Sequence, residues 1–266
     1  MTRKKKKHTD INHVRREIDR VDNALLGLIA ERLELASAVR QAKSGVRVWR
    51  PSREESHVRD LSKATSDTPA NLVSRIWAEL MSASLAIQGP MRLHIALEGD
   101  ALDVWTLVRD RFGSALPALS YPTASSALAA AYSEDEGVAI LPAPGGMNNW
   151  WTALCDDGAM PDMHILSGLP RTGKAEWPRA VAVATAALQA SGADDSLIAL
   201  NNTDALKAYS GTPVFRAEAG MKKLYSLPLF ITAESPLFQN IQSRDPSAKI
   251  IGCLPWPLGS EKSENI

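Results

Sequence analysis

The chain has 266 residues, a length that indicates about two domains. Hydrophobic residues make up 45% and charged residues 23%, close to the averages of globular proteins, which excludes a wholly disordered chain. Thirty basic and 30 acidic residues cancel, so no net charge attracts the chain to nucleic acid or to an anionic membrane.

The N-terminal run is basic, at residues 3–8, and no apolar stretch of the kind found in signal peptides follows it. We expect residues 1–9 to form a disordered arm. Two cysteines are too few for a disulfide framework or a four-cysteine zinc site, and they indicate a reducing compartment. No apolar run of about 18 residues could span a membrane. The sequence therefore predicts a cytoplasmic protein.

From Ile11 to about Ser44, apolar residues recur in steps of three and four, the pattern of a heptad seam. This predicts a helix of about 50 Å, which needs a partner along its length. Thr9 or Asp10 can cap its start. Arg32 interrupts the seam, and a buried cation requires an anion, either a carboxylate of the bundle or a ligand.

Two shorter helices are predicted next. Ser52 and Glu55 have the spacing of a capping box, which predicts a helix from Ser52 to about Lys63. A third helix is expected from Pro69 to Gly89. Ser84 and Gln88 share a face of this helix, which indicates a ligand cavity, although a buried serine can also bond to its own helix.

These features resemble the all-helical class of chorismate mutases over residues 10–90. The matching positions, in chain order, are Val14-Arg15, Ile18-Asp19, Asp22, Ala30-Glu31-Arg32, Val39 to Lys43, Arg53-Glu54 and Ser84 to Gln88. The family often has an aspartate where this chain has Arg50. The resemblance implies an all-α, three-helix domain over residues 10–91 that forms an intertwined homodimer.

The spacing of the cations gives independent support for a dimer. Lys43 follows Arg32 by eleven residues, so both lie on one side of the helix about 16 Å apart, a span that suits a small dicarboxylate. Arg15 lies about 42 Å from Lys43 along the same helix. If Arg15 serves the same site, it must come from a second chain.

The resemblance also implies the chemistry, a cofactor-free and metal-free rearrangement of chorismate to prephenate in phenylalanine and tyrosine biosynthesis. It assigns catalysis to Lys43, Gln88 and Arg32. Lys43 and Gln88 would donate to the ether oxygen, and Arg15 and Arg32 would hold the two carboxylates. The remaining substrate-binding positions are Arg53, Glu54 and Ser84.

After Pro90, short apolar strands alternate with amphipathic helices, which predicts an α/β region. Strands are expected at residues 93–97, 137–141, 179–184, 197–200, 225–231 and 249–253. Helices are expected at residues 102–112, 124–132, 203–208 and 236–243.

This region resembles prephenate dehydratase (residues 92–190) followed by the regulatory ACT domain (residues 191–258), with a tail at 259–266. The dehydratase motifs are replaced by Glu98-Gly99-Asp100-Ala101, Pro142-Ala143-Pro144 and Pro178-Arg179-Ala180, so that only Arg179 remains. We therefore expect the C-terminal region to be non-catalytic. We also assign no amino-acid site, since the motifs near Asp204 and Glu218 are altered.

Two other motifs have ordinary explanations. Residues 168–174 have the spacing of a phosphate-binding loop, but Ala175 replaces its hydroxyl residue, so we expect a turn. Trp150-Trp151 is expected in a core or an interface.

Two alternative functions remain open. An isochorismate-pyruvate lyase on the same scaffold would use overlapping residues. A non-catalytic regulatory partner of a shikimate-pathway enzyme would account for Arg50 and for the altered second half.

Overall fold

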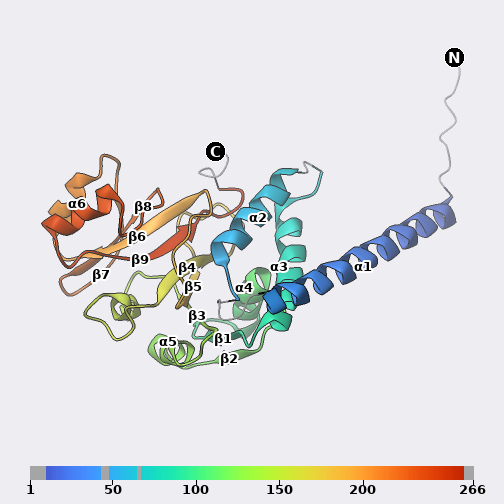
Figure 1. Cartoon of the computed structure of the whole chain (residues 1–266), viewed down its shortest axis with the longest axis horizontal. Helices are drawn as coiled ribbons and strands as arrows, with labels where there is room; N and C mark the ends of the chain where they lie inside the picture. Colours follow the sequence, from blue (N-terminus) through green and yellow to red (C-terminus); the bar gives the residue numbers. More distant parts are fainter. Residues whose placement is uncertain (1–9, 43–47, 65–66, 261–266) are drawn as a thin grey trace, which may run out of the picture. The chain divides into compact units, whose positions relative to one another are not determined.

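The computed structural model describes residues 10–42, 48–64 and 67–260, and the chain divides into two compact units, residues 1–44 and 45–266 (Figure 1). Among the described residues, no helix is long and apolar enough to cross a membrane.

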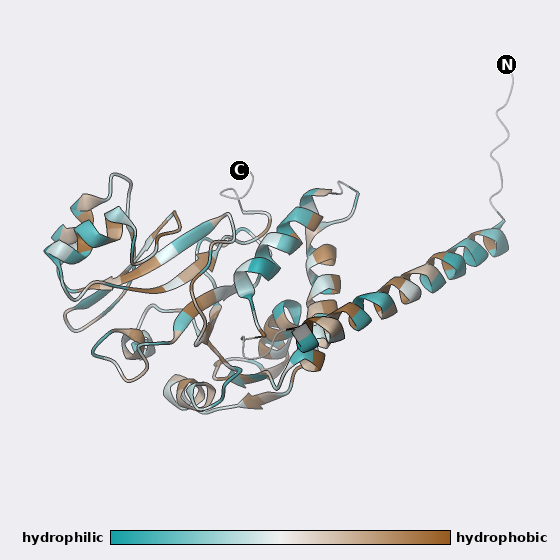
Figure 2. Cartoon of the chain, in the orientation of Figure 1, coloured by the Kyte–Doolittle hydropathy of each residue, from teal (hydrophilic) through white to brown (hydrophobic). Residues whose placement is uncertain are grey.

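The first unit contains one long helix, α1 (Ile11–Ala42). The Asp10 carboxylate accepts a hydrogen bond from the Asn12 N–H at 3.0 Å, which confirms Asp10 as a cap. At 32 residues the helix is about 48 Å long. The apolar residues of its seam are exposed, and their exposed fractions are 54% for Ile18, 62% for Leu28 and 61% for Leu35. Apolar and polar residues intermix along the whole helix (Figure 2).

The second unit begins with a helical pair, α2 (Pro51–Ala64) and α3 (Ala70–Gln88), as predicted. Val58 on α2 packs in one cluster with Val73 and Met81 on α3. The predicted capping box is wrong. The helix α2 begins at Pro51, and both Ser52 and Glu55 are buried inside it. The Glu55 carboxylate pairs with arginines instead, a stronger attraction than a bond to a backbone N–H.

The rest of this unit is an α/β region, as predicted, built on a nine-stranded sheet in the order β2-β1-β3-β5-β4-β9-β6-β8-β7. Its first part comprises β1 (Arg92–Ile95), α4 (Ala101–Phe112), β2 (Ala118–Ser120), α5 (Ala124–Tyr132), β3 (Gly137–Pro142), the 3₁₀ helix η1 (Trp150–Leu154), β4 (His164–Leu169) and β5 (Ala180–Ala184). Its second part comprises β6 (Asp194–Leu200), the 3₁₀ helix η2 (Thr203–Ala208), β7 (Val214–Ala219), β8 (Lys222–Leu227), α6 (Pro236–Arg244) and β9 (Lys249–Pro255).

The second part has the order strand–helix–strand–strand–helix–strand, which is the ferredoxin-like motif. The strand expected at 225–231 lies instead at 222–227, because Pro228 has no N–H to extend the ladder. The predicted boundary at residues 190–191 falls between β5 and β6. The strands on its two sides belong to one sheet, in which β4 pairs with β9 through Ile165 and Gly252.

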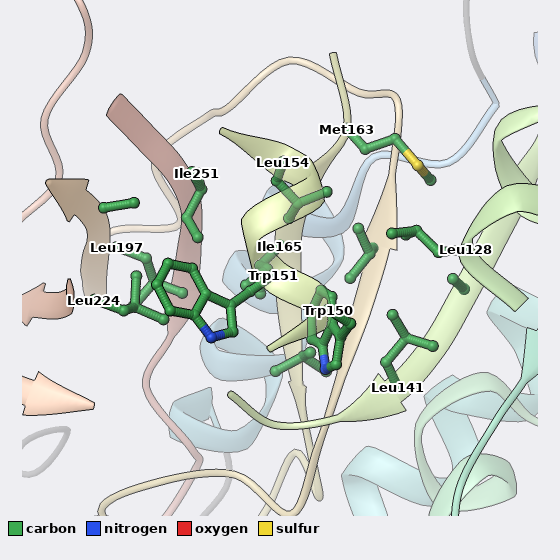
Figure 3. Close-up of a cluster of buried hydrophobic side chains, with 14 of the residues drawn as sticks. Leu128, Leu141, Trp150, Trp151, Leu154, Met163, Ile165, Leu197, Leu224 and Ile251 are labelled. Atoms are coloured by element: carbon green, nitrogen blue, oxygen red, sulfur yellow. The ribbon is translucent and has the colours of Figure 1, made fainter. Parts of the chain in front are cut away.

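Trp150 and Trp151 belong to the core, as expected, with exposures of 5% and 0%. Trp151 lies beside Leu197 and Leu224, whereas Trp150 lies on the side of Leu141 (Figure 3). Each indole N–H donates to a backbone carbonyl, that of Pro142 at 3.0 Å for Trp150 and that of Asn148 at 3.1 Å for Trp151. The pair therefore satisfies its polar atoms without facing solvent.

Arg111 on α4 attaches the helical pair to the sheet. Its side chain is 1% exposed and reaches Glu54 at 3.1 Å and Glu55 at 2.8 Å, both on α2. Its Nε donates to Ser167 Oγ on β4 at 3.1 Å. The helix α3 also packs closely on the end of α4, where a Cβ at Gly113 would come within 2.8 Å of the Ala78 carbonyl. The pair α2–α3 and the sheet are thus parts of one packed unit.

We expect Arg111→Met to lower the free energy of unfolding by about 3–5 kcal/mol, because it leaves two buried carboxylates with fewer positive partners. Denaturant unfolding followed by circular dichroism measures this loss. The control is Arg75→Met, which removes an exposed pair with Asp110 at 3.1 Å and should cost less than about 1 kcal/mol. Equal losses in the two variants would contradict the role given to Arg111.

Candidate functional site

The residues predicted to bind substrate lie on three helices in two units. Arg15 is exposed and Arg32 partly buried, both on α1, and Lys43 lies outside the described residues. Arg15 and Arg32 are seventeen residues apart, which is about 25 Å along the helix. No small ligand can touch both arginines of one chain.

The candidates on α3 are Ser84 and Gln88. Ser84 is buried, and its hydroxyl donates to the Leu80 carbonyl at 2.7 Å. Ser84 thus makes the bond to its own helix that is the alternative role of a buried serine. Gln88 is partly buried and is the last residue of α3.

The candidates on α2 differ in their surroundings. Arg53 is exposed. The Glu54 side chain is only 12% exposed, and its Oε2 accepts from Arg111 Nη1 at 3.1 Å. The Arg171 Nη2 lies 4.0 Å from the same oxygen. Glu54 therefore has a fixed carboxylate that faces the α/β region.

The packing brings these four residues to one end of the helical pair. Val48, just before α2, lies against Gly89, just after α3. Trp49 packs in the same cluster as Leu85. Hence the first turn of α2, with Arg53 and Glu54, and the last turns of α3, with Ser84 and Gln88, lie at the same end.

Sequence reasoning missed the most strongly charged part of the interior, an ion cluster around Glu55. Its oxygens lie 2.8 Å from Arg111 Nη2 and 3.2 Å from Arg171 Nε, and a third arginine, Arg59, is also buried nearby. Burial alone would raise the pKa of Glu55, but the charges of Arg171 and Arg111 outweigh it and hold that pKa below its ordinary value. The sequence contains one indication of this cluster, because Arg111 stands among the apolar residues Val108 and Phe112 of its helix, and a cation on an apolar face requires a buried anion.

Arg171 is the other unusual cation of this cluster. It is 4% exposed, and burial, followed by the nearby charge of Arg111, lowers its pKa. Among the described residues, neither Nη1 nor Nη2 has a hydrogen-bond acceptor. Arg171 also lines a pocket of about 260 Å³, together with residues of α2, β4, the 170–178 loop, β6 and the end of β9.

The positions at which the sequence analysis expects altered dehydratase motifs have structural roles. The Asp100 carboxylate caps α4 by accepting from the Leu102 N–H at 2.9 Å. The carbonyls of Pro142 and Pro144 accept from the indoles of Trp150 and Trp177. Arg179 is exposed. Within the parts of the chain that the structure describes, no three His, Cys, Asp or Glu side chains are grouped to hold a metal ion.

Residues 14–89 match the family described as chorismate mutase type II. A bifunctional chorismate mutase/prephenate dehydratase of Neisseria gonorrhoeae (strain ATCC 700825 / FA 1090) is 34% identical over 82 residues, which cover 30% of this chain and 22% of that protein. The chain thus matches about a fifth of the length of this curated relative. The family resemblance predicted for residues 10–90 is confirmed, and it places a chorismate mutase domain in this part of the chain.

Two solved structures align with the chain at 11% identity. A prephenate dehydratase from Streptococcus mutans gives a TM-score of 0.42 and covers 62% of this chain and 98% of its own. A protein described as GqqA, a novel type of quorum quenching acylases, gives a TM-score of 0.43 and covers 63% of this chain and 96% of its own. Both scores lie below 0.5, so no conclusion about this chain rests on them.

We expect acid to destabilise the protein through Glu55. Its pKa is lowered in the folded state, so its contribution to stability is complete above the ordinary value of 4.5 and is lost as the pH falls through the folded pKa. The free energy of unfolding, measured from pH 6 to pH 3, should therefore fall less steeply in Glu55→Gln than in the wild type. The exposed Glu98 supplies the control. An unchanged slope in Glu55→Gln, or an equal change in Glu98→Gln, would show that Glu55 is not the titrating group.

Proposed function

We propose that this protein is a chorismate mutase, which rearranges chorismate to prephenate without a cofactor in phenylalanine and tyrosine biosynthesis. The match of residues 14–89 to the type II family is the observation that carries the proposal. The arrangement of Arg53, Glu54, Ser84 and Gln88 at one end of the α2–α3 pair supports it.

The reaction requires positioning and donors rather than a nucleophile. The substrate must be held in a compact conformer in which the bond-forming carbons meet. The breaking C–O bond places partial negative charge on the ether oxygen, where Lys43 and Gln88 would donate. Arg15 and Arg32 would each hold a carboxylate with a bidentate guanidinium.

Arg53, Ser84 and Glu54 would complete the substrate contacts. Arg53 and Glu54 would place the ring and its hydroxyl, and Ser84 a carboxylate. Arg111 fixes Glu54 through Oε2, so a substrate hydroxyl would meet a carboxylate already oriented from the α/β region. In this arrangement Arg111 is a positioning residue for the mutase site.

We propose that the active form is a homodimer through α1. The exposed seam of α1 supports this, because about 48 Å of helix carries side chains that gain stability only when they are covered. The separation of Arg15 and Arg32 supports it as well, since one substrate could be held by both only if they belong to different chains.

The C-terminal region is proposed to be non-catalytic, with no dehydratase activity. The structural roles of Asp100, Pro142 and Pro144 and the exposure of Arg179 support this proposal. A cytoplasmic location also remains a proposal. It is supported by Cys155 and Cys253, which are buried, unpaired thiols.

The mutase proposal is tested by following the loss of chorismate absorbance. We expect Arg32→Ala and Lys43→Ala each to lower kcat/KM at least about a hundredfold, since each removes a preorganised donor. Arg16→Ala, an exposed arginine at the outermost heptad position, should change kcat/KM less than twofold.

Other outcomes would identify the alternatives. Pyruvate release from isochorismate without chorismate turnover would identify the lyase. No turnover of either substrate would favour the regulatory partner. If Arg32→Ala lowered the melting temperature but kept turnover per folded molecule, Arg32 would be only a structural ion pair.

We expect sedimentation to give a dimer and Leu28→Glu to convert it to a monomer with turnover reduced at least tenfold, because the variant places a charge in the seam. Asn23→Glu is the matched control, since Asn23 lies on the opposite face of α1. An active monomeric wild type, or dissociation of both variants alike, would contradict an interface along this seam.

A further inference from the structure

Three contacts hold the segment just before α2 in place. The Val48 N–H donates to the Glu136 carboxylate at 3.1 Å. The side chain of Val48 lies so close to Gly89 that a Cβ there would come within 2.8 Å of it. Trp49 is 3% exposed and belongs to the core. The next residue, Arg50, therefore extends from a fixed backbone, at the end of the helical pair that carries the proposed mutase residues.

Arg50 stands immediately before α2 and is partly buried. The Glu54 N–H donates to its carbonyl at 3.1 Å, and Pro51 disfavours a helical backbone at Arg50. No described residue forms a hydrogen bond or an ion pair with the Arg50 guanidinium. Its N–H donors are therefore available to a ligand.

Arg53 adds a second cation beside Arg50. The two residues are three positions apart, a spacing that makes side chains neighbours at the start of a helix. The adjacent carboxylate of Glu54 is already compensated, since it lies 3.1 Å from Arg111 and 4.0 Å from Arg171. Two like charges in the first turn repel each other, and the helix dipole disfavours both. A bound anion would offset this electrostatic cost.

Ser84 leaves a donor missing at this end of the site. Its role in the proposed mutase is to hold a carboxylate, but a serine has a single hydroxyl proton. That proton is donated to the Leu80 carbonyl at 2.7 Å. A carboxylate placed here needs another donor, and a guanidinium can supply two parallel N–H groups as well as the charge.

We propose that Arg50 is a further substrate-binding residue of the mutase, and that it holds the carboxylate assigned to Ser84. The inference rests on the proposed function, whose substrate is a dicarboxylate. A carboxylate keeps its charge throughout the rearrangement, so this contact is equally strong in the ground state and in the transition state. Arg50 therefore contributes to binding of the substrate rather than to the chemical step.

Steady-state kinetics of the full chain with chorismate test the inference. We expect Arg50→Met to raise KM at least about tenfold while kcat changes less than about threefold, because the lost contact is uniform. Arg50→Lys keeps the charge without the fork and should raise KM only about threefold. Lys63→Met, exposed in the last turn of α2, is the matched control and should change neither constant more than about twofold.

Thermal unfolding distinguishes binding from a structural role. Arg50→Met removes one of two like charges, so its melting temperature should stay within about 1 °C of the wild type or rise. A melting temperature lowered by more than about 3 °C, with KM unchanged, would make Arg50 a structural residue and overturn the inference.

Reversal of the charge gives the strongest contrast. Arg50→Asp introduces the residue that the family often has at this position, and it should raise KM at least about a hundredfold because it repels the carboxylate. An unchanged or lower KM in Arg50→Asp would overturn the inference, as would a loss in Arg50→Met confined to kcat. Either result would leave the proposed function intact if the wild type turns over chorismate. A wild type without turnover would instead overturn the proposed function, and this inference with it.

Discussion

The packing of the second unit depends on the burial of three arginines and two glutamates between α2 and the sheet. Removing such charges from water costs several kcal/mol for each ion, and only close opposite charges offset that cost. Arg111 supplies this compensation from α4 and Arg171 from the loop after β4, while Glu54 and Glu55 are adjacent on α2. The cluster therefore requires that α2, α4 and the end of β4 stay together.

This requirement gives the α/β region a role that needs no chemistry of its own. Glu54 is a proposed substrate contact, yet its carboxylate is oriented by Arg111. The α/β region, which is proposed to be non-catalytic, would thus still orient a proposed substrate contact of the mutase. Losing it would leave Glu54 and Glu55 without their nearest cations and would expose the face of α3 at Ala78 and Ser82 that packs on Gly113. A lack of dehydratase activity would therefore not make the region dispensable for folding.

The helices and strands that were predicted correctly from the sequence are those that a local pattern of residues determines. The helices α1 and α3 and the buried strands β3 and β5 carry periodicity that depends only on neighbouring residues. The sequence did not predict β2, which has three residues, β7, an edge strand with Val214 and Phe215 exposed, or the buried strand β4, in which Ser167 and Gly168 interrupt the apolar run. The ion cluster was also missed, because Glu55 and Arg171 are 116 residues apart and Ser52-Glu55 fits a capping box equally well. Periodicity does not encode pairing at such a distance.

The proposed site also could be predicted only in part, for a geometric reason. Arg53, Glu54, Ser84 and Gln88 lie at one end of the helical pair because α2 and α3 pack as a hairpin, a local arrangement that short loops favour. Arg15 and Arg32 lie on one straight helix, which fixes their separation at about 25 Å. A single chain therefore presents two sets of groups, and a substrate held by both arginines requires a second chain to bring them together. In the proposed homodimer the exposed seam of α1 would join the two chains, so that their association and the completion of the proposed site would be one and the same event.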